Sequence, residues 1–108
     1  GLPLDTQWSD IDYMTSYRDF TVDPVYFGSL GHFVEVLHNM TKHYIPIIDA
    51  GISVRADKDE RYTSYLTGVE QDVFIKTESG EIFVGQVWPV DAAYPDFFNP
   101  NTTTWWND

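Results

Sequence analysis

Residues 7–14 read QWSDIDYM, which places one indole ring and two acids at the end of a predicted strand. Side chains alternate along a strand, so Trp8 and Asp10 are expected on one face and Ile11 on the other. Aspartate is a poor strand residue and is costly to bury without a partner, which favours a ligand-facing position for Asp10 beside the ring. The alternative, in which Asp10 caps a following turn and Trp8 is ordinary core, carries equal weight on periodicity alone.

The composition limits the class of protein. A chain of 108 residues suits one small domain, and its formal net charge of -11 argues against nucleic-acid or anionic-membrane partners, which require clustered Lys or Arg. Four Trp, seven Tyr and seven Phe make the chain rich in flat rings, the groups that pack on the C–H faces of sugars. We therefore interpret residues 7–14 as part of a sugar-holding site.

Neither a membrane span nor a signal peptide is predicted, because no apolar run of about 18 residues occurs and the N-terminus lacks basic and apolar regions. The absence of Cys excludes a disulfide scaffold and a thiolate zinc site. Two sequons, Asn39-Met40-Thr41 and Asn101-Thr102-Thr103, permit N-glycosylation if the protein is secreted, although such tripeptides are common by chance.

A helix is predicted downstream of the opening strand. Its apolar stripe falls at spacings of three and four, with Ser29 as a candidate N-cap, and consists of Leu30, Phe33, Val34, Leu37 and Met40. Because His32 and His38 lie off this stripe, we expect them to be solvated rather than metal ligands.

Residues 44–49, YIPIID, form an almost continuous apolar run typical of a strand buried on both faces, and this run also ends on a carboxylate. Strand, helix and strand make a βαβ unit, so the two strands are expected to be parallel, with Asp10 and Asp49 at one edge. That edge is where α/β folds bind ligands. Pro46 disfavours a central strand because proline has no backbone N–H to donate to the hydrogen bonds between strands.

The remainder is predicted as a loop over residues 54–67, followed by a hairpin of residues 73–76 and 82–88 around a turn containing Gly80. Residues 102–108 are predicted to begin a helix with Asn101 as its cap. Adjacent Trp105 and Trp106 point in different directions on a helix, which favours one of them in the core.

Among the side chains that could act in catalysis or bind metals, only Asp and Glu are plentiful in the sequence. No Ser, His and Asp arrangement, Gly-rich phosphate loop, H-E-x-x-H spacing or EF-hand occurs, so hydrolases of the nucleophilic-serine type, nucleotide sites and zinc proteases have no sequence basis. Asp57, Asp59 and Glu60 are interpreted as a solvated face rather than a calcium site, and no metal site is predicted.

Several motifs together resemble one family, and they occur in the same order as in that family. They are PLDTQWSDIDYM at 3–14, RDFT at 18–21, LHNMTKHYIPIIDAGIS at 37–53, GQVWP at 85–89 and YPDFFNPNTTTWW at 94–106. The chain is similar over nearly its whole length to the catalytic barrel of glycoside hydrolase family 31, the α-glucosidases.

The resemblance implies a (β/α)8 TIM barrel, retaining hydrolysis of terminal α-linked glucose in maltose or starch-type oligosaccharides, and no metal or organic cofactor. Asp10 is similar to the family's Asp that holds sugar hydroxyls, Ile11 to the apolar residue beside it, and Trp8 to the ring beneath that strand end. Ile52 matches a position lining the same pocket, and Trp88 matches its aromatic wall. A secretory, lysosomal or extracellular location is also implied.

The sequence departs from the family at two turns: Val90 stands where the family usually has Gly, and the turn beginning at residues 50–52 lacks the family's Pro. The nucleophile motif W-x-D-M-N-E and the acid/base Asp do not occur, so no catalytic residue is assigned. Since a (β/α)8 barrel needs roughly 250 residues, we expect an α/β segment of about two parallel strands, the intervening helix and an inserted β-hairpin, completed by the remainder of the same barrel.

Two other classes of function remain open on the sequence. The first is a non-catalytic carbohydrate-binding module that uses the same aromatic and acidic edge. The second is a protein-interaction fragment with a fortuitous motif, which the sequence favours least.

Overall fold

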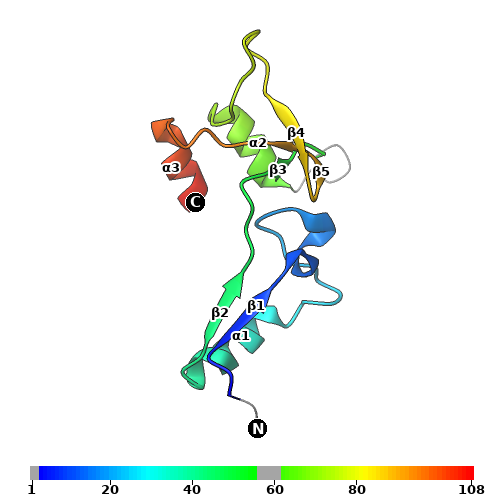
Figure 1. Cartoon of the computed structure of the whole chain (residues 1–108), viewed down its shortest axis with the longest axis vertical. Coiled ribbons are helices and arrows are strands. Elements are labelled where there is room, and N and C mark those ends of the chain that lie inside the picture. Colours follow the sequence, from blue (N-terminus) through cyan, green and yellow to red (C-terminus); the bar gives the residue numbers. More distant parts are fainter. Residues whose placement is uncertain (1–2, 56–61) are drawn as a thin grey trace. The chain divides into compact units, whose positions relative to one another are not determined.

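The computed structural model describes residues 3–55 and 62–108, and it divides the chain into two compact units, Gly1–Ile48 and Asp49–Asp108 (Figure 1). Length alone suits one small domain, whereas the contacts within the chain separate these two groups of elements. Each unit is described separately. Asp57, Asp59 and Glu60 lie outside the described residues.

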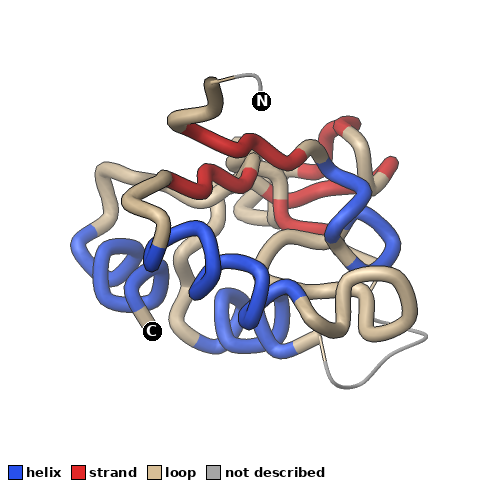
Figure 2. Tube along the Cα trace, turned by 90° about the horizontal axis from the view of Figure 1, so that it is seen from below, coloured by secondary structure: helices blue, strands red, loops and turns tan. Residues whose placement is uncertain are grey.

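The first unit contains the predicted βαβ arrangement. Strand β1 (Thr6–Ser9) pairs in parallel with strand β2 (His43–Pro46), and helix α1 (Leu30–Asn39) connects them (Figures 1 and 2). The register runs from Thr6 opposite His43 to Ser9 opposite Pro46. The Ile47 N–H extends the ladder by donating to the Ser9 carbonyl at 2.9 Å. The prediction of two parallel strands joined by a helix is confirmed.

Strand β2 is shorter and more exposed than predicted. It ends at Pro46 rather than reaching Asp49, and Ile45 and Ile48 are both exposed. Pro46 has no N–H to donate, and within the described residues β1 is the only strand paired with β2. The prediction of a strand buried on both faces was wrong for this chain, because an apolar run is buried on both faces only where other elements cover both.

Helix α1 follows the predicted stripe only in part. Leu37 is buried, whereas Phe33 and Met40 are exposed, and the Phe33 ring packs edge-on against Tyr44 with centroids 6.4 Å apart. Ser29 occupies the N-cap position, but its side chain makes no capping hydrogen bond.

Both helix histidines are exposed, as predicted. His32 Nδ1 lies 3.7 Å from the Glu35 carboxylate. Among residues 3–55 and 62–108, no cluster of three or more His, Asp or Glu is arranged to hold a metal ion, and no helix is long and apolar enough to cross a bilayer.

The second unit is built on an antiparallel sheet in the order β3 (Ile52–Ser53), β5 (Val90–Ala93), β4 (Val84–Val87). Helices α2 (Thr63–Glu70) and α3 (Pro100–Asn107) belong to the same unit. The core cluster combines residues from these elements and the intervening segments: Ile52, Tyr62, Val73, Phe74, Ala93 and Trp105. Trp105 is buried and Trp106 only partly so, which confirms that one of the adjacent indoles is core.

The prediction of a loop over residues 54–67 was wrong at its end, because α2 begins at Thr63. This helix has no strong apolar stripe, so the sequence pattern does not predict it. Tertiary packing stabilises it instead. Gly68 lets it approach the core so closely that a Cβ at this position would lie 2.5 Å from the Phe74 ring and 3.2 Å from that of Trp105. Tyr65 also stacks on Phe74, with ring centroids 5.6 Å apart.

The predicted turn at Gly80 is present, with φ at +87°, but the chain also forms a second hairpin. Around Gly80 the arms share a bridge between Lys76 and Ile82. The regular pairing of β4 is instead with β5, and the chain reverses between Val87 and Val90. Strand β5, which reads VDAA, was not predicted because it is short and contains few strand-favouring residues.

The cap of the last helix is Asn99 rather than the predicted Asn101. The Asn99 side chain accepts a hydrogen bond from the Asn101 N–H at 3.0 Å, and Pro100 occupies the first turn, where its missing N–H costs nothing. The helix therefore starts two residues before the predicted position.

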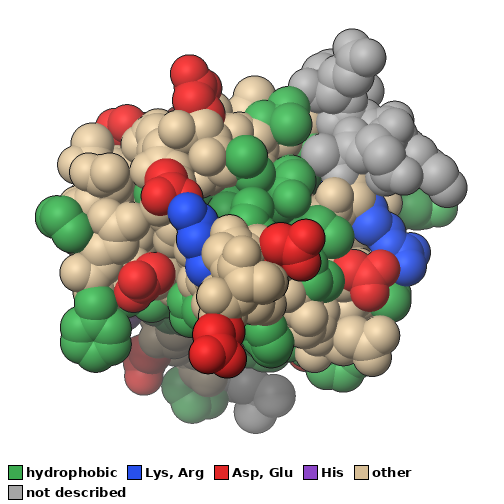
Figure 3. All heavy atoms as spheres, turned by 90° about the horizontal axis from the view of Figure 1, so that it is seen from above, with side chains coloured by type: hydrophobic (Ala, Val, Ile, Leu, Met, Phe, Trp, Pro, Cys, Tyr) green, Lys and Arg blue, Asp and Glu red, His purple; other side chains and the backbone are tan. Residues whose placement is uncertain are grey.

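Most exposed charge is acidic. The face in Figure 3 shows more Asp and Glu than Lys and Arg side chains, with hydrophobic side chains between them, in agreement with the net charge of -11.

The close approach of α2 to the core rings at Gly68 predicts that a larger residue at this position destabilises the protein. Gly68→Ala in the full-length protein should destabilise by about 1–3 kcal/mol, because the new methyl overlaps two core rings. Gly31→Ala is a matched control, since nothing lies within 4 Å of a Cβ there and alanine favours the helix by up to about 1 kcal/mol. Thermal unfolding of the two variants measures the contrast, and equal melting temperatures would contradict the packing described.

Candidate functional site

The exit of β1 positions Asp10. Asp10 keeps an extended backbone, with φ at -79° and ψ at -178°, before the chain turns into the 3-10 helix η1 (Ile11–Tyr13). Its Oδ1 accepts a hydrogen bond from the Ile11 N–H at 2.8 Å, so Asp10 caps the turn, as the alternative interpretation predicted. Asp10 is nevertheless exposed, and no hydrogen bond to its Oδ2 is found within residues 3–55 and 62–108. This exposed carboxylate therefore has one oxygen engaged and one without a hydrogen bond to the described residues.

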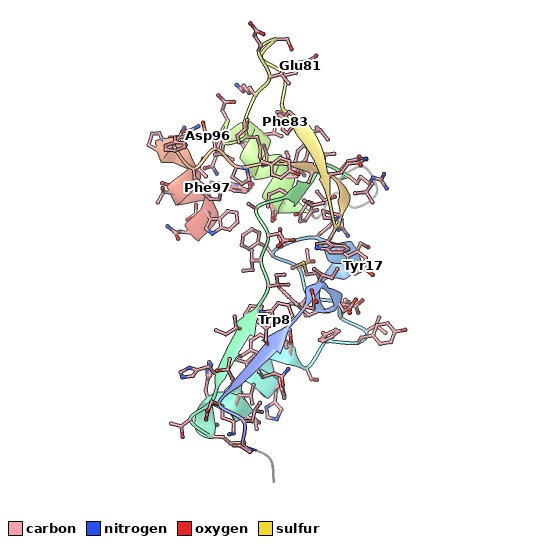
Figure 4. All side chains as sticks on the ribbon, viewed as in Figure 1. Trp8, Tyr17, Glu81, Phe83, Asp96 and Phe97 are labelled. Carbon is pink, nitrogen blue, oxygen red and sulfur yellow. The ribbon has the colours of Figure 1, made fainter. Side chains whose placement is uncertain are left out.

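Trp8 is not ordinary core in this structure. Its side chain is 50% exposed, whereas Gln7 and Ser9 on the other face of β1 are half-buried. The ring of Trp8 is labelled on the ribbon of the first unit in Figure 4. The extended backbone of Asp10 continues the strand alternation by one residue, which puts its carboxylate on the same face of the strand as this ring. Ile11 follows at the start of η1 and is half-buried. Trp8, Asp10 and Ile11 are thus neighbours around one strand end.

Tyr13 anchors this turn, a role that no local pattern in the sequence indicates. The side chain is buried, and its hydroxyl donates to the Ile47 carbonyl at 2.8 Å, just beyond the end of β2. Burial, followed by the nearby Asp19 carboxylate and the Tyr44 phenol, raises the pKa of Tyr13 to about 12. The neutral phenol therefore ties the segment capped by Asp10 to the neighbouring strand exit.

The segment after η1 is held in uncommon backbone conformations. A second 3-10 helix, η2 (Thr15–Tyr17), follows, and Ser16, Tyr17 and Phe20 have φ of 52°, 57° and 62°. Arg18 and Asp19 are buried, and the Arg18 Nε donates to the Thr15 carbonyl at 3.3 Å. Such strain persists only where the surroundings over-determine it, and it is common beside ligand sites.

Ile52 and Trp88, the other two predicted pocket residues, belong to the second unit. Ile52 lies on β3, is 0% exposed and is part of the core cluster, so its side chain contacts protein on all sides. Trp88 is 63% exposed and occupies the turn between β4 and β5. A shared pocket containing Asp10, Ile52 and Trp88 remains a prediction, whereas Trp8, Asp10 and Ile11 are adjacent along one segment.

The two departures from the family pattern lie next to these residues. Val90, which directly follows the turn at Trp88 and Pro89, has φ at +75°, the region that glycine adopts without strain. Gly51 precedes Ile52 and is buried, and a Cβ at this position would lie 2.5 Å from Val87 Cγ2. The chain therefore keeps a glycine-like conformation at Val90, and the lack of a side chain at residue 51 allows β4 to pass close by.

Comparison with known proteins identifies the family. The family model described as "Glycosyl hydrolases family 31 TIM-barrel domain" matches residues 1–108. The chain is 46% identical over 112 residues to an alpha-glucosidase of Schizosaccharomyces pombe, and 44% identical over 106 residues to the lysosomal alpha-glucosidase of Bos taurus. It covers 12% of the first relative and 11% of the second, and thus spans only a small part of each.

Solved structures agree with these relatives. The DNJ-bound glucosidase II alpha subunit matches 96% of this chain with a TM-score of 0.87 and 30% identity, and this chain covers 11% of it. The same subunit has also been solved in a Glc1Man2-bound form. The family 31 alpha-glucosidase from Bacteroides thetaiotaomicron matches 98% of this chain with a TM-score of 0.79 and 40% identity, and this chain covers 17% of it.

The Tyr13 anchor predicts a pH-dependent effect on stability. Tyr13→Phe should destabilise the full-length protein by about 0.5–1.5 kcal/mol at pH values well below 10, because the Ile47 carbonyl loses its donor. The folded pKa of about 12 exceeds the ordinary value of 10.0, so the stability that the phenol contributes is complete below 10 and is lost as pH rises toward 12.

The difference in melting temperature between wild type and Tyr13→Phe, measured across this range, checks the prediction. Other tyrosines titrate in both proteins and cancel in the difference. A difference that does not change with pH would show that the Tyr13 phenol is not held in its neutral form by the fold.

Proposed function

The chain belongs to glycoside hydrolase family 31, and from this membership we propose that it is a segment of a retaining α-glucosidase that removes terminal α-linked glucose from oligosaccharides. In this proposal the segment contributes part of the sugar-binding pocket and not the catalytic carboxyl groups. The remainder of the same (β/α)8 barrel completes the site. The observation that carries the proposal is the exposed Asp10 carboxylate, which uses only Oδ1 within the described residues, on the same face of the strand as the half-exposed Trp8 ring.

Asp10 suits the role of holding sugar hydroxyls. Its Oδ2 accepts hydrogen bonds from a ligand without disturbing the cap made by Oδ1, and hydrogen bonds to a charged acceptor each contribute about 1.5–3 kcal/mol. The Trp8 indole offers a flat face to the C–H groups of a pyranose ring. Ile11 adds an apolar side chain next to Asp10, and the family resemblance implies that Ile52 and Trp88 of the second unit also line the sugar pocket. Within that unit Ile52 is buried and Trp88 is exposed.

The names of the relatives support the proposed substrate class. The names alpha-glucosidase and lysosomal alpha-glucosidase support an α-glucoside, and the DNJ-bound and Glc1Man2-bound structures of glucosidase II support a sugar ligand. The narrower choice of maltose or starch-type α-glucosides is what the family resemblance implies. We propose a location in the secretory pathway, in a lysosome or outside the cell, because the relatives include lysosomal and ER glucosidases. No metal or organic cofactor is part of the proposed reaction.

The proposal leaves bond cleavage to other parts of the enzyme. A retaining glycosidase needs two carboxyl groups about 5–5.5 Å apart, one as nucleophile and one as acid and base. Neither motif that would supply these groups occurs in the sequence. Asp10 is already assigned to holding substrate, and Asp12, two residues along in η1, is exposed with no assigned role.

Asp10→Asn tests the binding role in the full-length enzyme. Asparagine retains an oxygen that can cap η1, so the turn should survive, while the charge that strengthens hydrogen bonds to sugar hydroxyls is lost. We expect kcat/KM on a maltose-type substrate to fall by a factor of about 10 to 100, corresponding to about 1.5–3 kcal/mol. Asp12→Asn is the matched control, because it removes one nearby exposed charge and should leave kcat/KM nearly unchanged.

A twofold or smaller effect of Asp10→Asn, equal to less than ~0.5 kcal/mol, would show that the assigned role is wrong. If Asp10→Asn abolished sugar binding in a full-length protein that hydrolyses no α-glucoside, the non-catalytic binding module would be the better description.

The absence of a catalytic pair gives a second test. Purified residues 1–108 should not hydrolyse a chromogenic α-glucoside, and their near-UV circular dichroism should lack the bands of fixed aromatic packing, because a two-stranded parallel pair has unpaired edges and little to cover it. Turnover that persists after contaminating glucosidase is removed, and is lost on changing Asp10 or Asp12, would mean that the segment carries its own catalytic pair.

A further inference from the structure

The structure separates the two N-glycosylation sequons into one that suits a glycan and one that does not. We propose that Asn39 carries an N-linked glycan in the mature protein and that Asn101 does not. Both sequons lie within the described residues, so their surroundings can be compared directly. The inference requires passage through the secretory pathway but is independent of the sugar-binding role of Asp10.

Asn39 presents an open acceptor. It is the last residue of α1, and Asn39, Met40 and Thr41 are all exposed. Within residues 3–55 and 62–108, no hydrogen bond is found to the Asn39 carboxamide or to the Thr41 hydroxyl. A glycan attached to Asn39 Nδ2 would therefore break no side-chain hydrogen bond within residues 3–55 and 62–108.

Asn101 is already used by the fold. Its Nδ2 donates to the Gln71 carbonyl at 3.5 Å, and Thr102, the middle residue of this sequon, is 0% exposed. The Thr102 hydroxyl lies 2.6 Å from the Asp96 carbonyl and 3.4 Å from that of Val73, which fixes this turn of α3 against the unit. A branched glycan on Asn101 would displace the contact with Gln71 and crowd a turn whose next residue is fully buried.

A second, independent observation concerns Thr41. The Thr41 N–H donates to the His38 carbonyl and the Lys42 N–H to the Leu37 carbonyl, each at 2.9 Å, which is the Schellman arrangement at a helix C-terminus. Thr41 occupies the position that normally holds glycine, and its φ is +57°, an outlier for a β-branched residue. Glycine would adopt this positive φ without strain, whereas a sequon requires a residue with a hydroxyl at this position.

The proposed glycan lies away from the candidate sugar-binding edge of the first unit. The turn at residues 40–42 leads from the C-terminus of α1 into the start of β2, where His43 pairs with Thr6. Asp10 follows the opposite end of β1, beyond the pair of Ser9 and Pro46. Four residues of strand, at about 3.3 Å each, separate the two edges, so a glycan at Asn39 leaves the strand exits uncovered.

The modification is a group transfer from a lipid diphosphate-linked oligosaccharide, supplied with its transferase by the secretory pathway. Asn39 Nδ2 attacks the anomeric carbon of the first sugar, forming a C–N bond as the bond from that carbon to the diphosphate oxygen breaks. The lipid diphosphate leaves with the bonding pair, and Nδ2 loses one proton to a base of the transferase. No oxidant or reductant is needed.

Site occupancy in the full-length protein, secreted from a eukaryotic host, tests the proposal. The protein is treated with a glycan-releasing amidase in heavy-oxygen water, and the tryptic peptides are read by mass spectrometry. We expect most Asn39 to appear as labelled Asp and Asn101 to remain Asn. Unlabelled Asn39, or labelled Asn101 in a substantial fraction of molecules, would overturn the assignment.

Two variants test the role of Thr41. Thr41→Ser keeps the hydroxyl and should keep the Asn39 glycan. Thr41→Gly should remove the glycan and, compared with enzymatically deglycosylated wild type, should raise the melting temperature because glycine relieves the positive φ. A glycan retained in Thr41→Gly, or a lower melting temperature, would contradict the proposal that Thr41 is kept for the sequon. Activity should be unchanged in both variants, so a failure of this test is distinct from a failure of the role of Asp10.

Discussion

The parallel ladder between β1 and β2 is the constraint on which the candidate site depends. Parallel strands cannot be joined by a tight turn, so the chain needs a long crossover, which α1 supplies. The same pairing brings both strand exits to one edge, where the Tyr13 hydroxyl reaches the Ile47 carbonyl. Without this register, η1 would lose the hydrogen bond that ties it to the neighbouring strand exit.

The hydrophobic periodicity of the sequence and the residues that end its strands and helices predicted the first unit well. The alternation around Trp8, the spacing of three and four from Leu30 to Met40 and the apolar run before Asp49 are local signals, and each corresponds to an observed element. The errors in this unit concern the length and the burial of one strand. Strand β2 ends at Pro46, and its burial depends on elements that no local pattern describes.

The second unit was predicted less well because tertiary contacts form its elements. Helix α2 depends on close contact of Gly68 with Phe74, which pairs residues from separate elements. Strand β5 exists because β3 and β4 pair with it on both sides, although VDAA has little strand propensity of its own. For the same reason, the burial of Ile52 could not be read from the sequence, whereas Asp10 stood out as a residue that is costly to bury without a partner.

Capping and ligand holding, which the sequence presents as alternatives for Asp10, are compatible in the structure because a carboxylate has two oxygens. The cap directs Oδ1 at the Ile11 N–H and thereby limits the rotation of the side chain, so less conformational freedom remains to be lost when Oδ2 binds a hydroxyl. Tyr13 then holds the capped turn against the neighbouring strand exit. In the proposed role, a residue that stabilises the local fold with one atom would thus be preorganised to bind a sugar with the other, so the capping role is no argument against the proposed binding role.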